Sequence, residues 1–333
     1  MTKVLFIWRV NDRLKQYLQD GLSKIADLKL IFPTEFTNEN YQELAKDVDI
    51  IVGWRPAKEL LESAKNLKLY INPGAGIQHL IKLFREVTRD KEIILVNGHG
   101  NSYFTAQHGV ALLLAAMNKI IPHHNWMKEG KWRLGDNEAR SIPLRDRKVG
   151  FLGYGNVNRK IHMMLQGFDL EFAALKRDWQ FDTMDLKQFK IEELHDFLVY
   201  IDILFCAVPH TSKTTNLITE KELELLGKDA ILVNLSRGAV VNEKALFEAL
   251  KNRKIDRAAI DVWYDYQPEP DEKGRRYPYS YPFYELENIV LSPHRAASPF
   301  DDLKRWDEVV ENISRLCAGR SDFLNIVNLE NEY

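Results

Sequence analysis

An arginine, an aspartate and a histidine in the second half of this chain each stand at the end of a short apolar run. Arg237 follows ILVNLS, Asp261 ends AAID, and His294 follows IVLSP. A guanidinium can hold a carboxylate through two hydrogen bonds and can polarise a neighbouring ketone. An imidazole titrates near neutral pH, so it can give a proton to the oxygen of a ketone that is being reduced. We therefore expect Arg237 to bind such a substrate and His294 to act as its general acid and base.

A pair of glycines upstream indicates where a dinucleotide would bind. An apolar run at residues 149–152 leads into GYGNVN, and a helical pattern follows. This is the first half of the fingerprint GxGxxG, in which a helix N-terminus receives a pyrophosphate. Four residues of this turn are expected to contact a cofactor: Gly153, Gly155, Asn156 and Val157. Asn158 replaces the last glycine of the fingerprint, and we expect it to shift the helix without removing the phosphate site.

These residues need elements that bring them to a common edge. ILVNL is a continuous apolar run, which is typical of a strand buried on both faces of a parallel sheet. Open sheets of this kind bind ligands at the carboxyl ends of their strands. Similar runs predict further strands of the same sheet at residues 149–152, 201–208, 258–262 and 289–291. Asn242 is expected to cap the helix after Arg237.

The first hundred residues form an α/β pattern of their own. Apolar runs separated by polar helical stretches predict strands at residues 4–8, 28–32, 50–53, 68–71 and 93–96. The fourth run is followed by Asn72, Pro73, Gly74, Ala75 and Gly76. Glycine allows the main chain to approach an anion closely. A plain turn between a strand and a helix explains the same residues equally well.

In their order and spacing, these motifs resemble those of the D-2-hydroxyacid dehydrogenases, which use NAD or NADP. The resemblance rests on VGFLGYGNVNRK, on VPHTSKTTNLITEKELELLGKDAILVNLSRGAVVNEKALFEAL, on AAIDVW and on ENIVLSPHRAAS, and it covers roughly residues 101–298. It implies an α/β fold with two doubly wound parallel-sheet domains. A Rossmann-type coenzyme domain, residues 99–296, would be inserted into a flavodoxin-like substrate domain, residues 1–98 and 297–333.

The resemblance also implies roles for single residues. Arg237 would bind the substrate carboxylate and polarise the ketone, and Asp261 would lie near the nicotinamide carboxamide. The remaining expected cofactor contacts are Thr105, Val208, Pro209, Leu235 and Ser236, and the remaining expected substrate contacts are Gly74, Ala75, Gly76 and Asn101. Purely structural roles stay open as alternatives: Arg237 as a surface cation, Asn101 as a helix cap, and Asp261 as a carboxylate that caps the next turn.

Cofactor choice depends on the residues about 20 positions after the glycine turn, where NAD users place an acid on the ribose hydroxyls. This chain reads FDLEFAALKRDW there, with Lys176 in the place of the acid and Arg177 beside it. A cation cannot accept the ribose hydrogen bonds, but it can pair with the 2′-phosphate of NADP. We predict that NADP is preferred over NAD. Asp178 remains an alternative ribose ligand if the strand ends one residue later.

The expected partner of His294 is the least regular part of the pattern. Most relatives place a glutamate before a proline soon after the aspartate, and it stabilises the imidazolium. This chain has Gln267 before Pro268, one residue beyond the usual spacing. We predict that Gln267 orients His294, with Asp265 and Glu269 as alternatives. An amide adds no negative charge, so His294 would be protonated less readily than in a glutamate-paired site.

These expectations lead to one favoured function and two alternatives. The favoured function is reduction of a small 2-oxo acid, with glyoxylate and hydroxypyruvate as leading candidates because Trp54 and Arg55 suggest a small polar site. A Gln–His pair resembles that of NAD-dependent formate dehydrogenases, which need no proton from histidine. A dinucleotide-sensing regulator without turnover is the third possibility. The precise substrate and the role of the aromatic loop at residues 268–282 stay open.

Composition narrows the range of partners. The 333 residues are 45% hydrophobic with a net charge of −2, which favours two buried cores and gives no electrostatic reason to bind nucleic acid or an anionic membrane. Two cysteines and no leader-like segment favour the cytoplasm. No metal site is expected, since the adjacent His123 and His124 cannot share one helical face. The apolar stretch at residues 101–120 predicts a buried helix that packs between the domains or against another subunit. The resemblance implies that this helix helps to form a homodimer through the coenzyme domain.

Overall fold

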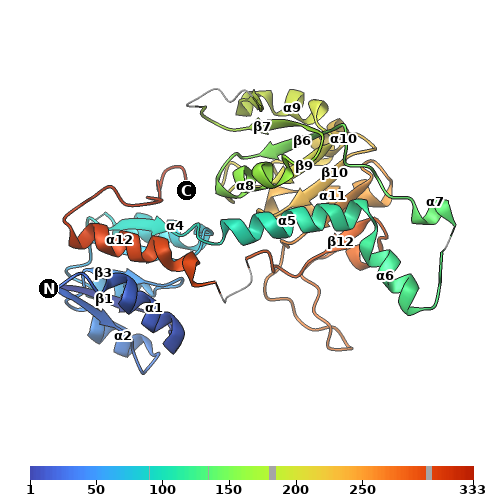
Figure 1. Cartoon of the computed structure of the whole chain (residues 1–333). Helices are drawn as coiled ribbons and strands as arrows, with labels where there is room; N and C mark the ends of the chain where they lie inside the picture. Colours follow the sequence, from blue (N-terminus) through green and yellow to red (C-terminus); the bar gives the residue numbers. More distant parts are fainter. Residues whose placement is uncertain (90, 134, 180–184, 298–301) are drawn as a thin grey trace. The chain divides into compact units, whose positions relative to one another are not determined.

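The computed structural model describes residues 1–89, 91–133, 135–179, 185–297 and 302–333. The chain divides into two compact units, Met1–Asn101 with Pro299–Tyr333 and Ser102–Ser298 (Figure 1). The sequence predicts the corresponding boundaries at residues 98/99 and 296/297. Both units are α/β structures built on parallel sheets, which confirms the predicted fold class.

In the described residues, the first unit holds a five-stranded parallel sheet with the strand order β2-β1-β3-β4-β5. This order is that of flavodoxin-like folds. Its strands are β1 (Thr2–Phe6), β2 (Leu28–Ile31), β3 (Ile50–Val52), β4 (Leu69–Asn72) and β5 (Ile94–Asn97). Its helices are α1 (Asp12–Leu22), α2 (Asn38–Ala45), α3 (Lys58–Ser63), α4 (Gln78–Val87) and α12 (Asp307–Cys317). Helix α12 packs against α1, so the end of the chain folds with its beginning.

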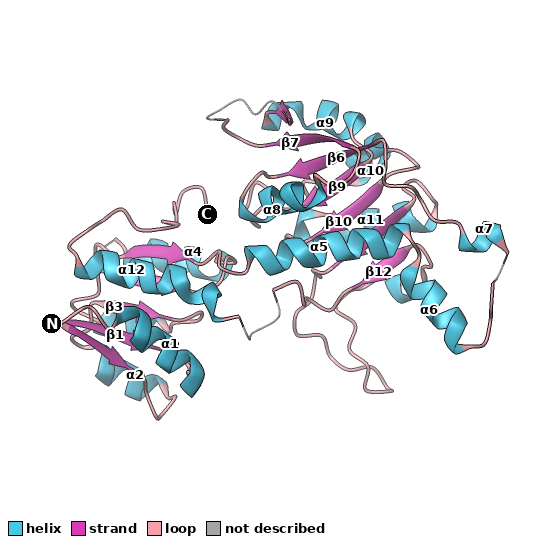
Figure 2. Ribbon diagram, viewed as in Figure 1, coloured by secondary structure: helices cyan, strands magenta, loops and turns pink. Residues whose placement is uncertain are grey.

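The second unit holds a seven-stranded parallel sheet within the described ranges, in the order β12-β11-β10-β9-β6-β7-β8 (Figure 2). Its strands are β6 (Arg147–Leu152), β7 (Leu170–Leu175), β8 (Lys187–Phe189), β9 (Ile203–Cys206), β10 (Ile231–Asn234), β11 (Arg257–Ile260) and β12 (Ile289–Leu291). Its helices are α5 (Ser102–Met117), α6 (Ile120–Lys128), α7 (Asp136–Ala139), α8 (Asn156–Leu165), α9 (Leu194–Tyr200), α10 (Glu220–Leu226) and α11 (Glu243–Lys251). Short 3-10 turns are η1 (Ile191–Glu193), η2 (Gly238–Val240), η3 (Phe283–Glu285) and η4 (Leu303–Trp306).

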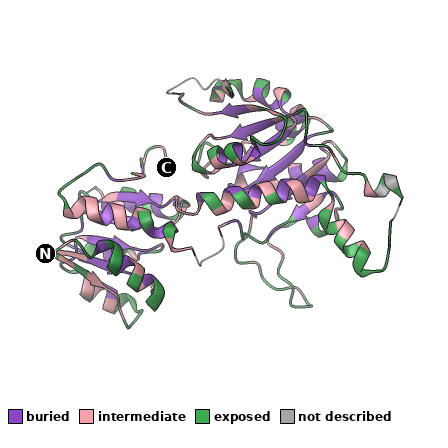
Figure 3. Ribbon diagram, in the orientation of Figure 1, coloured by how far each residue is buried: buried purple, intermediate pink, exposed green. Residues whose placement is uncertain are grey.

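Helices cover both faces of the larger sheet and produce two apolar layers. Helices α9, α10 and α11 pack on one face, and α5 and α8 pack on the other. The strands between them are buried along most of their length (Figure 3). Burial on both faces explains why the central strands read as continuous apolar runs rather than as alternating ones.

Helix α5 packs on the larger sheet with one side. Its residues Ala106, Gly109, Leu112, Leu113 and Ala116 are buried against α8 and the sheet. Its other side is open in the single chain, where Tyr103 is 50% exposed. Packing of this helix between the domains or against another subunit stays a prediction.

Within the described residues, no helix combines the length and the apolar composition that crossing a membrane requires. Cys206 is buried in β9 and Cys317 lies in α12, and both are free thiols.

Candidate active site

The carboxyl ends of the parallel strands bring most of the predicted residues of the second unit to one edge of its sheet. Strand β6 lies between β7 and β9. The chain therefore adds β7 on one side of β6 and β9 on its other side, and the strand order reverses at β6. Such a switch point is where open α/β sheets bind ligands. The residues that follow the strands at this edge are Gly153 after β6, Lys176 after β7, Val208 and Pro209 after β9, Leu235 to Arg237 after β10, Asp261 after β11 and His294 after β12.

Asp261 connects the ends of β11 and β12. Its side chain is buried, and Oδ1 accepts hydrogen bonds from the Ser292 hydroxyl and from the Arg295 backbone N–H at 2.7 Å. Oδ2 accepts from the Ala296 N–H at 3.0 Å. Charged acceptors make the stronger class of hydrogen bond. The carboxylate thus caps the turn that carries His294, which lies more than 30 residues along the chain and is not the next turn after Asp261. A contact of Asp261 with the nicotinamide carboxamide stays a prediction.

The turn around His294 adopts an unusual backbone conformation. His294 has a φ of 56°, in the left-handed region that L-residues seldom occupy. Residues on both sides of it are held by Asp261, and the indole Nε1 of Trp263 donates to the Ser292 carbonyl at 2.8 Å. His108 of α5 reaches the Ser292 hydroxyl at 2.9 Å. Strained conformations of this kind persist where the surroundings fix them from several directions.

Arg237 stands on a turn shaped by the last residue of β10. The Asn234 side chain accepts from the Ser236 N–H at 3.0 Å and donates to the Arg237 carbonyl at 3.2 Å. A Cβ added to Gly238 would lie 2.3 Å from the carbonyl oxygen of Trp263, so glycine is needed where these loops touch. The half-buried guanidinium of Arg237 donates to the Ser236 carbonyl at 2.7 Å. It has no carboxylate partner among the described residues, which leaves donors for a ligand.

Tyr266 contacts His294 at the place that the sequence assigned to Gln267. The Tyr266 hydroxyl lies 3.3 Å from Nδ1 of His294, and the two rings meet edge to face with centroids 5.2 Å apart. The backbone N–H of Gln267 donates instead to Asp265 at 2.8 Å. In the described part of the chain, His294 makes no hydrogen bond with Gln267, Asp265 or Glu269.

The spacing from Asp261 could have identified Tyr266, but its residue type did not suggest this role. Gln267 lies one position beyond the usual spacing from Asp261, so Tyr266 occupies the usual spacing. A search for a carboxylate or an amide passes over a phenol at that position.

The electrostatic surroundings of the histidine favour its neutral form. Loss of hydration lowers the pKa of His294, the charge of Arg237 lowers it further, and Asp261 opposes these effects. Loss of hydration raises the pKa of Tyr266, which keeps its phenol neutral near pH 7. The direction of the hydrogen bond between them depends on the ring tautomer, because the hydroxyl can donate to a bare Nδ1 or accept from an Nδ1–H.

The glycine turn after β6 has the geometry that a dinucleotide requires. Gly153 has a φ of 81°, and a Cβ added there would lie 2.7 Å from Val208. Gly155 caps α8, and a Cβ added there would meet no atom within 4 Å, so the helix N-terminus opens onto free space. A helix N-terminus with this exposure suits a pyrophosphate. Asn156 and Val157 form the first turn of α8.

Asn158 joins the glycine turn to the sheet. Its side chain is fully buried, and Nδ2 donates to the carbonyls of Leu152 at 3.2 Å, Gly153 at 2.6 Å and Phe205 at 3.4 Å. The amide therefore links the glycine turn to strands β6 and β9. The expected shift of α8 with retention of the phosphate site stays a prediction.

The predicted selectivity residues lie just beyond β7. Lys176 is half-buried, and its ammonium lies 5.9 Å from the ring of Trp179. Arg177 and Asp178 are exposed beside it. Two cations and one carboxylate are thus available at the place where the adenosine ribose binds in Rossmann folds.

The expected substrate loop belongs to the first unit. The Asn72 side chain donates to the Gly74 carbonyl, and Asn97 donates to the Ala75 carbonyl at 2.9 Å, so both amides shape the loop before Gly76. Asn101 is the last residue of the first segment of this unit, and Thr105 lies on α5 of the other unit.

An aromatic cluster lies beside this loop. A Cβ on Gly74 would come within 3.3 Å of Trp54 Nε1. The ring of Trp54 meets that of Trp8 edge to face at 4.9 Å, and Trp306 stacks on Trp8 at 5.6 Å. The surroundings of Trp54 are therefore more aromatic than the small polar site that the sequence suggested. Among the described residues, no group of three or more histidine, cysteine or acidic side chains could hold a metal ion.

Comparison with known proteins identifies the larger unit. Residues 110–296 match the family model described as D-isomer specific 2-hydroxyacid dehydrogenase, NAD binding domain.

A D-3-phosphoglycerate dehydrogenase of Archaeoglobus fulgidus is 31% identical over 241 residues, which are 72% of this chain and 43% of that protein. The corresponding enzyme of Methanocaldococcus jannaschii is 27% identical over 99% of this chain and 60% of its own length. The chain thus spans less than two thirds of these relatives. A glyoxylate reductase of Pyrococcus furiosus is 28% identical over 83% of this chain and 81% of that protein.

Solved structures share the fold over the whole chain. A D-isomer specific 2-hydroxyacid dehydrogenase from Xanthobacter autotrophicus in complex with NADPH matches with a TM-score of 0.78 at 24% identity, covering 100% of this chain and 99% of that one. An NADPH-dependent glyoxylate/hydroxypyruvate reductase from Sinorhizobium meliloti matches with a TM-score of 0.79 at 19% identity, covering 100% of both chains. At these identities the likeness shows the fold alone.

The contact between Tyr266 and His294 predicts which substitution changes the titration of the histidine. The Tyr266 hydroxyl can donate to neutral imidazole, and it can accept a stronger, charge-assisted bond from the Nδ1–H of imidazolium, so its loss costs the charged form more. Tyr266→Phe should therefore lower the pKa of His294. An NMR titration of the imidazole C–H signal, assigned with His294→Ala, measures this shift. Gln267→Ala is the control and should leave the titration unchanged; a shift in that variant alone would restore Gln267 as the partner.

Proposed function

The chain belongs to the family of D-isomer specific 2-hydroxyacid dehydrogenases, and we propose that it reduces a small 2-oxo acid to a D-2-hydroxy acid with a nicotinamide dinucleotide. One observation carries this proposal. Arg237 and His294 follow strands of one parallel sheet at the edge that also carries the glycine turn, and loss of hydration together with the charge of Arg237 lowers the pKa of the histidine. A binding cation and a proton donor are the two groups that carbonyl reduction requires of the protein.

In the proposed reaction, Arg237 holds the substrate carboxylate and draws electron density from the ketone oxygen. A bound nicotinamide would supply the hydride. His294 gives its proton to the oxygen as negative charge develops there. Because the pKa of His294 is lowered, its protonated form is lost as the pH rises through that lowered value. Reduction should therefore be favoured by lowering the pH, and oxidation by raising it.

Glyoxylate and hydroxypyruvate remain the proposed substrates. Several curated relatives are glyoxylate reductases, and the chain covers 81% of the one from Pyrococcus furiosus. A panel of 2-oxo acids that runs from glyoxylate to phenylpyruvate tests this assignment.

The two alternative functions have less support. The formate dehydrogenase hypothesis rested on a Gln–His pair, and His294 contacts Tyr266 instead. A dinucleotide-sensing regulator would bind the cofactor without turnover. Purified protein mixed with reduced cofactor and the substrate panel separates these hypotheses, since a regulator would bind NADPH and oxidise almost none of it.

Arg237 supplies the main prediction about activity. One preorganised charged donor is typically worth about 10²–10³ in rate. Arg237→Ala should lower kcat/KM for the best 2-oxo acid by that factor, and Arg237→Lys should recover only part of it because an ammonium lacks the planar fork. Arg145→Ala, at an exposed arginine near the other end of the sheet, is the control. Near wild-type kcat/KM in Arg237→Ala would remove this residue from the mechanism.

We also propose that NADPH is preferred, with Lys176 and Arg177 holding the 2′-phosphate. Lys176→Glu places a negative charge where the phosphate would bind and restores an acceptor for the ribose hydroxyls. We expect KM for NADPH to rise at least about tenfold, as loss of one charge-assisted contact implies, while KM for NADH stays equal or falls. Lys228→Glu makes the same charge change at an exposed lysine outside this edge. A lower wild-type KM for NADH than for NADPH would defeat the assignment.

We propose that the protein acts as a cytoplasmic homodimer formed through its second unit, Ser102–Ser298, which we call the coenzyme unit. Helix α6 and the segment after it expose large apolar side chains: Ile120 is 55%, Met127 54% and Trp132 72% exposed. Together with the open apolar side of α5, they form a surface that water hydrates poorly. We expect light scattering after gel filtration to give twice the chain mass, and Met127→Glu with Trp132→Glu to give the monomer. A wild-type monomer at micromolar concentration would exclude this assembly.

A further inference from the structure

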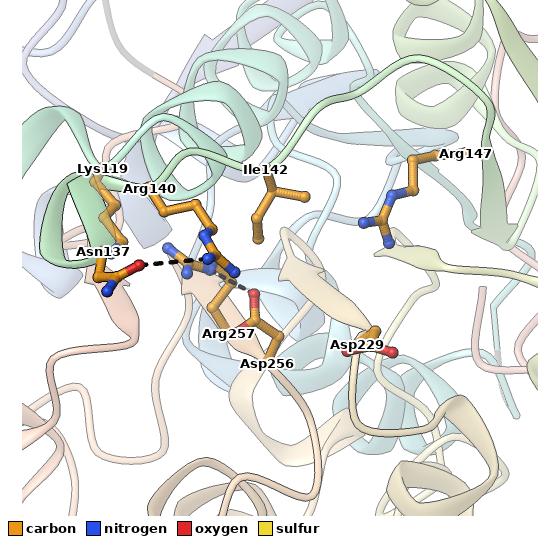
Figure 4. Close-up of a pocket in the computed structure, with 8 residues that line it drawn as sticks. All are labelled: Lys119, Asn137, Arg140, Ile142, Arg147, Asp229, Asp256 and Arg257. Atoms are coloured by element: carbon orange, nitrogen blue, oxygen red, sulfur yellow. Dashed lines mark hydrogen bonds and ion pairs between the residues drawn. The ribbon is translucent and has the colours of Figure 1, made fainter.

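A second cluster of charged residues lines a cavity in the coenzyme unit, away from the edge that carries Arg237 and His294. The cavity has a volume of about 470 Å³ and lies at the amino ends of the strands (Figure 4). Arg147 begins β6, Arg257 begins β11, and Asp229 precedes β10. Lys119 stands between α5 and α6, and Arg140 follows α7. The cavity therefore lies between the α6–α7 segment and the amino edge of the sheet.

The described lining of this cavity is positively charged. Four cations, Lys119, Arg140, Arg147 and Arg257, face two carboxylates, Asp229 and Asp256, which leaves a net charge of about +2. Asp256 is already paired with Nε of Arg257 at 2.8 Å, and Nη1 of Arg257 donates to the Ala116 carbonyl at 2.8 Å. Arg257 thus bonds to Asp256 and to the end of α5. Once the Arg257–Asp256 pair is set aside, the positive charges of the lining are those of Lys119, Arg140 and Arg147.

Two of the three arginines keep most of their hydrogen-bond donors available. Among the residues that the structure describes, Arg147 has no side-chain hydrogen bond or ion pair. In the same set, Arg140 has only a long contact of 3.5 Å to Asn137. A guanidinium carries five N–H donors, so these two side chains can offer several to a ligand. Figure 4 shows them on elements from different sides of the cavity.

The crowding of like charges supports an anionic occupant. Burial lowers the pKa of Lys119, and the charge of Arg257 lowers it further. An anion in the cavity would reverse that effect, because an opposite charge favours the protonated amine. Guanidinium groups match the planar or tetrahedral oxygens of carboxylates and phosphates through paired hydrogen bonds.

We propose that this cavity is a binding site for a small dianion, in which Lys119, Arg140 and Arg147 contact the phosphate or the paired carboxylates of a metabolite. The site is separate from the coenzyme turn and from Arg237. An occupant would link the α6–α7 segment to the first residues of β6 and β11, the strands that lead to Gly153 and Asp261. The bound ligand thus stabilises the framework of the coenzyme unit without touching the reacting groups.

Calorimetric titration of the full chain tests the proposal with two probes, inorganic phosphate and malonate, at constant ionic strength. In an Arg237→Ala background, which removes the proposed carboxylate site of the active centre, we expect saturable binding of at least one probe, with one site per chain. Saturation by phosphate alone identifies a phosphate-bearing ligand, and saturation by malonate identifies a dicarboxylate. Arg147→Gln and Arg140→Gln should each weaken binding at least tenfold, whereas Arg140→Lys should retain part of it.

Two controls keep the test specific. Arg145→Gln removes a nearby exposed arginine outside the cavity and should change the affinity less than twofold. Lys176→Glu changes a residue at the carboxyl edge of the sheet and should also leave the affinity for the probes unchanged. This result separates binding in the cavity from phosphate binding at the glycine turn. Thermal unfolding without anion verifies that each variant folds. Absence of saturable binding by both probes, or undiminished affinity in a folded Arg140→Gln/Arg147→Gln double variant, overturns the proposal.

Discussion

The buried carboxylate of Asp261 is the interaction on which the geometry of the candidate site depends. A buried charge is costly unless hydrogen bonds replace its lost hydration, and here Ser292, Arg295 and Ala296 supply them. Those donors belong to the loop after β12, so the hydrogen bonds to the Asp261 carboxylate hold this loop against the end of β11. The left-handed conformation of His294 is a consequence of that arrangement.

The same framework extends to the arginine and to the tyrosine. Trp263, two residues after Asp261, bonds to Ser292 and presents its carbonyl to Gly238, the residue after Arg237. The chain that leaves Trp263 brings Tyr266 onto the histidine ring. A neutral phenol adds no negative charge beside the imidazole, whereas Arg237 adds a positive one, so the protonated histidine becomes a stronger acid that exists over a lower pH range. Proton donation gains driving force, and the population of the donor decreases.

The parallel arrangement of the strands separates two kinds of chemistry at the two edges of one sheet. At the carboxyl edge, the glycine turn lies with the residues that follow β10 and β12, at the edge where open parallel sheets bind ligands. At the amino edge, Arg147 and Arg257 begin strands, and their charges meet Lys119 and Arg140 from the segment around α6 and α7. Strands β6 and β11 run from one edge to the other, and they give both sites a common rigid support.

By itself, the sequence determined the strands, the glycine turn and the edge at which Arg237, Asp261 and His294 lie. Burial on both faces requires continuous apolar runs, and a turn or a cap such as Asn242 is encoded by neighbouring residues. Only the tertiary structure decided that Tyr266 rather than Gln267 meets His294, that Asn158 binds the carbonyls of two strands, and that Lys119, Arg147 and Arg257 line one cavity. These partners depend on loop paths and on the register between segments that are far apart in the chain. Local patterns record whether a residue is buried, but they do not record which distant group it meets.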